Sequence, residues 1–333
     1  MAKIYDISQW NELAWFSTGG TRAKKLVQSP EGQLFYFKRS QYKEPTAIKP
    51  GKDFRYEFWS EIIAYNVGRF LGFNVLCYDI GHDGTNIGCI SESMFDAEKQ
   101  HFMEGIRFIQ GAYPEYEPDN KEHRKLYTFQ AIEGALSKFR LSGFCRNLVE
   151  TIVFDAIIGN GDRHQENWGI IMDHSGIRKA LDRLRTLSAT QLNSLDMESL
   201  YDTGVAFAPI YDSGSSLGRE LTEERIGALI ESPLMMETYL KRGQAEIHWN
   251  EKKLSHFELV RELLNSDYKA IITNRLSSIF NCEYSDFIRG TLIDIDSKVP
   301  DSFSEYKIPE SRKDFICKLI VSRIEILKQL IDA

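Results

Sequence analysis

Paired cysteines, long apolar runs and an excess of positive charge are all missing from this 333-residue chain. The five cysteines are scattered and form no C-x-x-C pair, so we expect neither a disulfide framework nor a zinc site. This usage indicates a reduced, cytoplasmic setting. No run of 18 apolar residues occurs and the first ten residues lack an apolar signal core, so we expect no membrane span. A net charge of −7 and a pI near 5.6 argue against a general nucleic-acid binder.

The chain does contain enough apolar material for a real core. Hydrophobic residues make up 42% of it and aromatic residues 12%. This length allows one large or two modest domains.

Residues 1–94 have the pattern of a small β-rich unit with one helix. Four stretches predict strands: 21–28, 33–39, 74–80 and 87–91. Apolar residues at helical spacing predict a helix over 54–71, which Gly72 ends.

Residues 95–333 are largely helical in pattern. The segments that predict helices are 126–139, 143–158, 222–236, 249–264, 267–280 and 311–331. Asn167 and Asp212 belong to two motifs described below and are separated by a long interval. This interval predicts a helical insertion at about 173–203. We therefore expect an α+β fold of two parts, a small β-rich part over 1–94 and a larger helical part over 95–333.

Two short motifs carry the chemistry. Asn160-Gly-Asp-Arg-His-Gln-Glu-Asn167 follows an apolar run and places Asp162 five residues before Asn167. Asp212-Ser-Gly follows later, again behind apolar residues. A D-x-x-x-x-N loop followed by D-x-G is typical of kinases. Together with the two parts described above, it predicts a two-lobed protein-kinase-like fold, with the N-lobe over 1–94 and the C-lobe over 95–333. We predict that Asp162 orients the acceptor hydroxyl, and that Asn167 and Asp212 hold Mg²⁺ on the phosphates of ATP.

The two residues after Asp162 each keep open interpretations. His164 could contact phosphates, order the loop by hydrogen bonding or act as a general base, and we favour the ordering role. Arg163 could neutralise phosphate charge or bind a carboxylate structurally.

A nucleotide site also needs residues from the N-terminal part. The glycine-containing segment with Gly19, Gly20 and Thr21 predicts a loop whose backbone N–H groups approach phosphates. At the junction of the two parts, Glu92 and Met94 flank the segment expected to meet the adenine edge.

A lysine on a strand and an acidic partner on the next helix complete the pattern. Lys38 ends an aromatic strand and is the candidate, with Arg39 as the alternative if the register shifts by one residue. Glu57 and Glu61 lie one helical turn apart, so either could pair with it, and we prefer Glu61.

Together these residues resemble the HipA-like kinase family, a bacterial group distantly similar to phosphatidylinositol kinases. The matching pieces, in family order, are Ser17–Lys24, Phe37-Lys38, Ser60–Ala64, Asn160–Asn167 and Pro209–Gly214. The resemblance implies ATP- and magnesium-dependent phosphorylation of serine or threonine hydroxyls on a protein substrate, often with autophosphorylation. Many members are toxins paired with an antitoxin.

The chain begins almost at the glycine loop. We therefore expect it to lack the additional N-terminal subdomain of full-length HipA, and to be similar to the short, stand-alone members or to the kinase subunit of split systems. The expected partners are a protein substrate and an antitoxin or accessory subunit, with no direct contact to nucleic acid.

Two alternatives and one further hypothesis accompany this interpretation. An inositol lipid kinase shares the D-R-H-x-x-N loop, and a catalytically silent nucleotide-binding scaffold would share the fold. Autophosphorylation is expected near the nucleotide, and the candidate acceptors are Ser17, Thr18, Thr21, Ser215 and Ser216.

Overall fold

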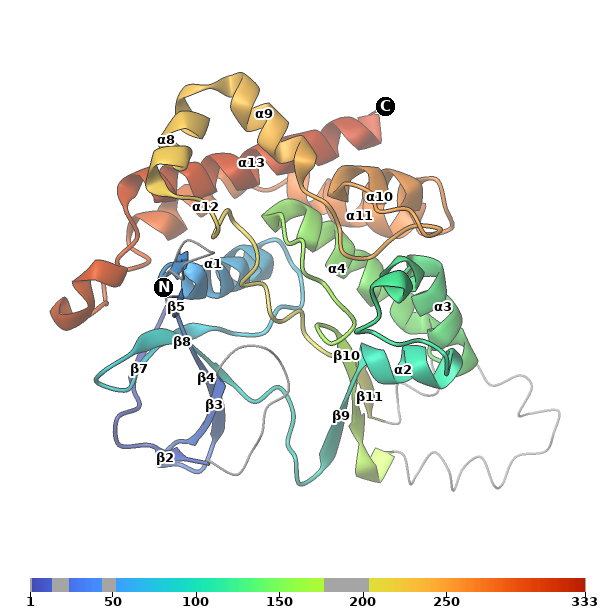
Figure 1. Cartoon of the computed structure of the whole chain (residues 1–333), viewed down its shortest axis with the longest axis horizontal. Coiled ribbons are helices and arrows are strands. Elements are labelled where there is room, and N and C mark those ends of the chain that lie inside the picture. Colours follow the sequence, from blue (N-terminus) through green and yellow to red (C-terminus); the bar gives the residue numbers. More distant parts are fainter. Residues whose placement is uncertain (1, 14–23, 44–51, 177–203, 333) are drawn as a thin grey trace.

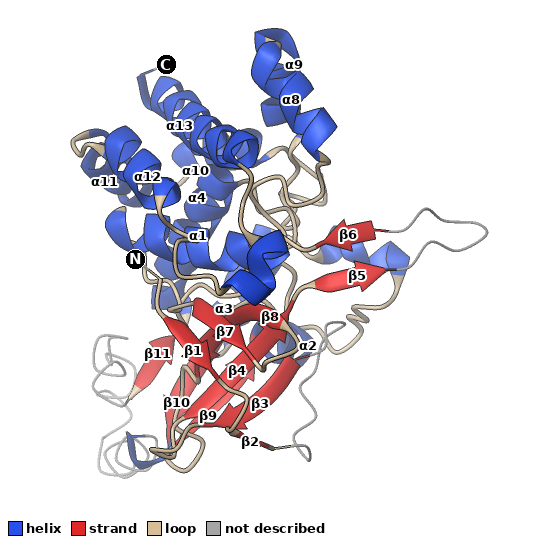
Figure 2. Ribbon diagram, turned by 90° about the vertical axis from the view of Figure 1, so that its left-hand side faces the viewer, coloured by secondary structure: helices blue, strands red, loops and turns tan. Residues whose placement is uncertain are grey.

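The computed structural model describes residues 2–13, 24–43, 52–176 and 204–332 of the chain (Figure 1). The fold is α+β, with a curled sheet in the N-terminal part and helices in the C-terminal part. Figure 2 shows most of the helices gathered on one side of the strands.

The N-terminal part is built on a six-stranded sheet in the order β1-β7-β8-β4-β3-β2. β1 and β7 are parallel, and the remaining neighbours are antiparallel. Its strands are β1 (Ile4–Asp6), β2 (Asn11–Glu12), β3 (Lys24–Gln28), β4 (Leu34–Arg39), β7 (Asp79–His82) and β8 (Ile87–Glu92). Of the predicted strand over 74–80, only the last two residues lie in a strand, while Val75 forms an isolated bridge with Ile210.

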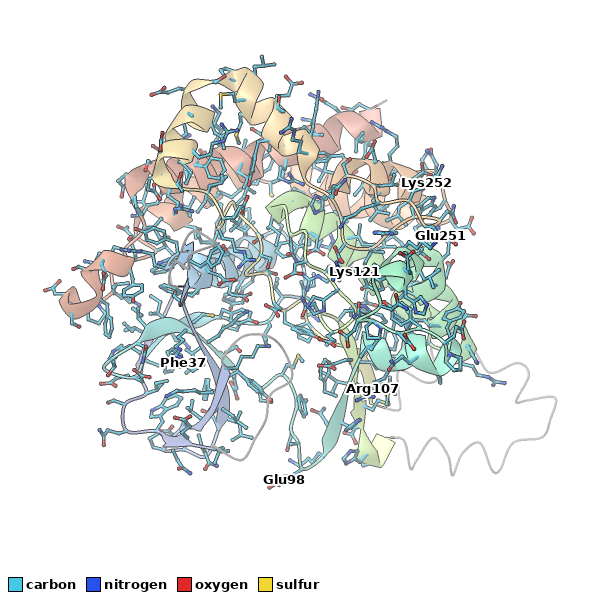
Figure 3. The ribbon with its side chains drawn as sticks, in the orientation of Figure 1. Phe37, Glu98, Arg107, Lys121, Glu251 and Lys252 are labelled. Atoms are coloured by element: carbon cyan, nitrogen blue, oxygen red, sulfur yellow. The ribbon has the colours of Figure 1, made fainter. Side chains whose placement is uncertain are left out.

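Side chains of β4 point alternately to the two faces of this sheet, and each face packs against a different part of the protein. Phe35 and Phe37 lie in a small separate core with Ile7, Val27 and Ile90, and Figure 3 labels Phe37 within this sheet. Successive strand residues point to opposite faces, so the neighbouring Lys38 points the other way, toward α1.

Helix α1 (Glu57–Phe70) packs against that second face. It begins later than predicted, because Lys52–Phe54 forms strand β6, which pairs with β5 (Gln41–Lys43). Gly72 follows its end with φ +81°, a left-handed conformation that suits glycine, as predicted.

A second, three-stranded antiparallel sheet follows, in the order β11-β10-β9. Its strands are β9 (Gln100–Glu104), β10 (Gly169–Asp173) and β11 (Val205–Phe207). β9 leads directly into α2 (Gly105–Ala112), and neither was predicted, because the surrounding sequence is polar.

Helix α4 (Cys145–Ile158) is buried along most of its length and packs against α10 (His256–Leu264), α11 (Lys269–Phe280) and α13 (Glu310–Asp332). The other helices of the C-terminal part are α3 (Phe129–Lys138), α8 (Glu223–Glu231), α9 (Pro233–Arg242) and α12 (Tyr284–Ile293). Short 3₁₀ helices cover Lys121–Leu126, Ser142–Phe144 and Asp301–Tyr306. Among the described residues, no helix is both long and apolar enough to cross a membrane.

Two predicted helices differ from the observed ones for local reasons. The helix expected over 222–236 breaks at Ser232, whose side chain caps α9, with Pro233 in its first turn. The helix expected over 249–264 begins only at His256, because Ser255 and Glu258 form a capping box there.

One large apolar core includes residues of α1 and of the C-terminal helices. Trp59, for example, is 1% exposed and donates its indole N–H to Tyr306 O at 2.7 Å. The division of the chain at residue 94 stays a prediction, as does the helical insertion, of which 177–203 lie outside the described residues.

Candidate active site

Lys38 is the centre of a buried ion cluster. Its ammonium lies 2.7 Å from Glu61 Oε1 and 2.6 Å from Asp212 Oδ1. Lys38 is 8% and Glu61 1% exposed, so these charges are largely withdrawn from water. The neighbouring Arg39 is exposed, so the register makes Lys38 the inward-facing cation.

Glu61 rather than Glu57 is the carboxylate that pairs with Lys38. Its second oxygen accepts the backbone N–H of Ser213 at 2.7 Å, which joins α1 to the D-x-G segment. Glu57, one turn earlier, binds Arg219 instead. The structure thus makes the pairing that we preferred from the sequence.

Asp212 takes an uncommon backbone conformation at this cluster. Its φ of +53° lies in the left-handed region, which Asp tolerates better than most residues. Its N–H donates to the phenol oxygen of Tyr78 at 3.4 Å. Burial, reinforced by Glu61 and Asp212, raises the pKa of Tyr78 well above its usual value, so this residue stays a neutral phenol.

The loop that carries Asp162 starts where α4 ends. Gly159 closes the helix in a left-handed conformation, and its N–H donates to Asp155 O at 2.8 Å. The Asn160 amide then donates to the Asp155 carboxylate at 3.0 Å, and its oxygen accepts the Asp162 N–H at 3.3 Å. The helix end therefore fixes the first residues of the loop.

Arg163 is a scaffold residue rather than a surface cation. It is 2% exposed, and its Nε and Nη2 donate to the two oxygens of Asp155 at 2.9 and 2.8 Å. Its Nη1 donates to the carbonyls of Asn167 and Tyr211. Burial opposes its charge, but Asp155 prevails and raises the pKa of Arg163. Of the two interpretations left open by the sequence, the structure shows the carboxylate-binding one.

The two motifs are held together by further bonds. Tyr211 OH donates to Glu166 O at 2.6 Å, which complements the bond from Arg163 to Tyr211. Ser215 Oγ donates to Asp162 Oδ2 at 2.9 Å. Asp212 lies between the two contact points in sequence, so the D-x-G segment and the loop of Asp162 form one site.

Within this loop, Asn167 and His164 have distinct contacts. Asn167 Nδ2 donates to Asp162 O at 2.8 Å, so its amide oxygen is the group directed away from that bond. His164 accepts the Glu166 N–H at Nδ1 (3.3 Å) and the Asn167 N–H at its carbonyl (2.9 Å). These contacts suit the loop-ordering role that we favoured for His164.

The structure gives little information on the residues that we predicted to contact the adenine and the phosphates. Gly19, Gly20 and Thr21 lie outside the described residues. Glu92 ends β8, is exposed and accepts a hydrogen bond from Gln33, and Met94 follows in the connection to β9. Their place at the adenine edge stays a prediction.

The oxygen groups of Asn167 and Asp212 fit a magnesium ion. Mg²⁺ is usually held by one or two protein oxygens together with phosphate oxygens of the substrate. In the described part of the chain, no group of three or more His, Cys, Asp and Glu residues could hold a metal. The ion would therefore depend on the nucleotide as well as on these two side chains.

No protein-family model matches the sequence, and no curated protein matches it either. Solved structures do match. The Helicobacter pylori proinflammatory kinase CtkA is 15% identical with a TM-score of 0.69, and the match covers 99% of both chains. HipA of Shewanella oneidensis, solved with HipB and operator DNA, is 12% identical with a TM-score of 0.51, over 99% of this chain and 70% of HipA.

The chain has the fold of the HipA-like kinases. The predicted fold class is thereby confirmed, and the likeness to CtkA extends over the whole length of both chains. At these identities the comparison establishes the fold, whereas the chemistry rests on the contacts described above.

Several residues of the site were missed from the sequence. Asp155 is a charged residue inside an apolar helix, which signals a buried and partnered group. Tyr127, whose hydroxyl donates to Arg163 O at 2.9 Å, gave no comparable signal. Tyr78 gave none either, because its contact with Asp212 joins residues that are distant in sequence.

Proposed function

We propose that this protein transfers the γ-phosphoryl group of ATP to a serine or threonine hydroxyl of a protein. One observation carries the proposal: Lys38 Nζ binds both Glu61 and Asp212, beside the loop that presents Asp162 and Asn167. A strand lysine paired with a helix glutamate, next to a catalytic Asp, an Asn and a D-x-G Asp, is the set that kinases use.

In this proposal each residue has a defined task. The Lys38 ammonium binds phosphate oxygens of ATP, and Glu61 keeps it in position. Asp162 accepts a hydrogen bond from the acceptor hydroxyl and takes its proton as the new O–P bond forms. Asp155 and Arg163 keep the loop in shape without touching the substrate.

Asn167 and Asp212 would hold Mg²⁺, which when bound neutralises charge on the phosphates. The Asn167–Asp162 bond orients the amide for that purpose. The glycine segment with Gly19, Gly20 and Thr21, and Glu92 with Met94 at the adenine edge, complete the proposed ATP site as predictions from the sequence.

The acceptor and the partners belong to the proposal as well. A protein hydroxyl, including one of the chain's own, is the proposed acceptor, and an antitoxin or accessory subunit is the proposed partner. The solved HipA neighbour, which is in complex with HipB and operator DNA, supports that second expectation.

The test compares the protein with its Asp162→Ala variant, using γ-labelled ATP, Mg²⁺, generic protein acceptors and inositol lipids. We expect labelled protein with the parent, a loss of at least about 10²-fold in the variant, and nucleotide binding close to normal in both. Equal rates in the two proteins would refute the role of Asp162. Label in lipid alone would replace the protein acceptor by a lipid.

A further inference from the structure

A groove of about 780 Å³ lies between the three-stranded sheet and helix α2. Figure 1 shows β9 and β11 beside this helix. The apolar side chains that line the groove come from the sheet (Met103, Met172 and Val205) and from α2 and the end of α3 (Phe108, Phe139 and Leu141). Most of them are only partly covered by the rest of the protein, and Phe139 is 42% exposed. An apolar surface of this kind marks a binding site.

The register of the sheet explains why these side chains gather on one face. Met172 of β10 lies opposite His101 of β9 on one side and Val205 of β11 on the other. Residues directly opposite one another point to the same face of a sheet, and so does Met103, two residues after His101. The three strands thus present a largely apolar face to the groove. Its two methionines have flexible side chains that adapt to different partners.

One end of the groove reaches the loop that carries Asp162. Glu104 ends β9 and lines the groove. The backbone N–H of Ile106, two residues later, donates to Gln165 O at 2.8 Å, within that loop. The groove therefore begins beside the position where the acceptor hydroxyl is expected.

Glu104 brings negative charge to this end of the groove. Burial, followed by the charge of Glu166 in the same loop, raises the pKa of Glu104. Arg107, which Figure 3 labels, lines the same end, and it and Lys24 act in the opposite direction, each less strongly than Glu166. The charge of Glu104 is thus incompletely compensated, and a cation brought by a ligand would relieve its repulsion with Glu166.

We propose that this groove binds a segment of the protein substrate, with a Lys or Arg side chain at Glu104 and Glu166 and apolar side chains farther along the groove. This inference rests on the proposed phosphoryl transfer. The acceptor hydroxyl must reach Asp162, so the substrate chain beside it passes the adjacent end of the groove. The carboxylates then select a basic residue close to the acceptor, and the apolar walls supply contact area for the residues beyond it.

The first experiment measures binding without turnover. Short fluorescent peptides contain a central serine with arginines on one side and Leu and Phe on the other, in both orders, and matched peptides carry Glu in place of Arg. We expect the arginine peptides of one order to bind the parent more tightly than their glutamate counterparts. Glu104→Gln should weaken that binding about three- to fivefold, as expected for a partly exposed ion pair. Phe139→Ser should weaken the binding of the same peptides through lost apolar contact.

A matched control tests whether the groove is the cause. Leu234 on α9 is 73% exposed and is not among the residues that line the groove. Leu234→Ser should therefore bind the peptides as the parent does. Equal loss in Leu234→Ser and Phe139→Ser, or no binding of any peptide to the parent, would overturn the proposal. A dimeric parent with a monomeric Phe139→Ser and unchanged peptide binding would overturn it as well, because the groove would then bind a second copy of the chain.

Steady-state transfer separates this inference from the proposed function. With the arginine peptide as acceptor, Glu104→Gln should raise KM for the peptide and leave KM for ATP unchanged. A raised KM for ATP with unchanged peptide binding would place Glu104 at the nucleotide and overturn the inference. Transfer to peptides without any preference for arginine would reject this inference alone. Specific peptide binding without transfer to any peptide or protein would reject the proposed function and, with it, the role of the peptide as a substrate.

Discussion

The candidate site contains two buried cations that are held in opposite ways. Arg163 donates to both oxygens of Asp155 and to two backbone carbonyls, so its planar guanidinium is fixed at four points. Lys38 is a compact ammonium that bridges carboxylates on two different elements, α1 and the D-x-G segment. A guanidinium suits a fixed geometry, and an ammonium can exchange its partners. We therefore expect Arg163 to maintain the structure of the site and Lys38 to bind phosphate.

Removing the fixed cation should have the largest effect on stability. Arg163→Met leaves the Asp155 carboxylate buried without its charge partner and frees the carbonyls of Asn167 and Tyr211. Breaking a buried pair from one side typically costs about 3–5 kcal/mol. We expect a loss of this size in the free energy of unfolding, measured by urea denaturation.

A surface ion pair provides the control for that measurement. Lys241 and Glu237 lie one helical turn apart on α9, and both are exposed. Lys241→Met should leave the denaturation midpoint unchanged within error. A similar loss in both variants would mean that the burial of Arg163 is not the cause.

His256 belongs to the fixed part and makes it sensitive to acid. Its Nε2 lies 2.8 Å from Asn160 O, and the bond requires a proton on that nitrogen. Burial, with Arg323 nearby, lowers the pKa of His256 from 6.5 to about 3. Below about pH 6.5 the unfolded chain therefore binds a proton that the folded chain does not, and stability falls as the pH drops toward 3.

His256→Gln should remove this acid sensitivity, because an amide can still donate to Asn160 O but does not titrate. Between about pH 6 and 4, the free energy of unfolding of the parent should fall more steeply than that of the variant. The difference should be about 1.4 kcal/mol per pH unit, the value for one proton. Parallel profiles would show that His256 is protonated in the folded protein or does not govern the acid response.

The same contrast explains which residues the sequence could predict. Short spacings single out Asp162, Asn167 and Asp212 as candidates, and their roles stay predictions. Local periodicity narrowed the ion pair to Lys38 or Arg39 and to Glu57 or Glu61. The structure was needed to choose Lys38 and Glu61.

The supporting residues could not be predicted in this way. The bonds of Tyr127 to Arg163 and of Tyr78 to Asp212 join segments far apart in sequence, so only the folded chain brings them together. For Asp155 a signal was present, since a carboxylate inside an apolar helix requires a buried partner. The bond of Ser215 to Asp162 likewise depends on how two loops meet.

The elements of the fold differ in the same way: those with a local sequence pattern could be predicted, and those that depend on distant partners could not. The strands around Lys38 and the helix α1 were expected from periodicity. Two differences had local signals in the sequence: Pro233 marks the break at Ser232, and Ser255 with Glu258 marks the start of α10. Our prediction followed the apolar spacing instead of these signals. Strand β9 had no such signal, because its hydrogen bonds depend on β10.

Among the changes within the candidate site, the smallest effect on stability should come from replacing Lys38 while keeping its charge. Lys38→Arg leaves a cation between Glu61 and Asp212, so we expect the free energy of unfolding to change by no more than about 1 kcal/mol. Transfer should nevertheless fall by at least about 10²-fold, since a rigid guanidinium that binds Asp212 through two nitrogens cannot turn to phosphate oxygens as an ammonium can. The measurement pairs urea denaturation with labelled transfer on one preparation. Retained transfer would show that Lys38 needs no ammonium in order to bind phosphate. A loss of stability as large as that of Arg163→Met would show that Lys38, like Arg163, mainly stabilises the fold.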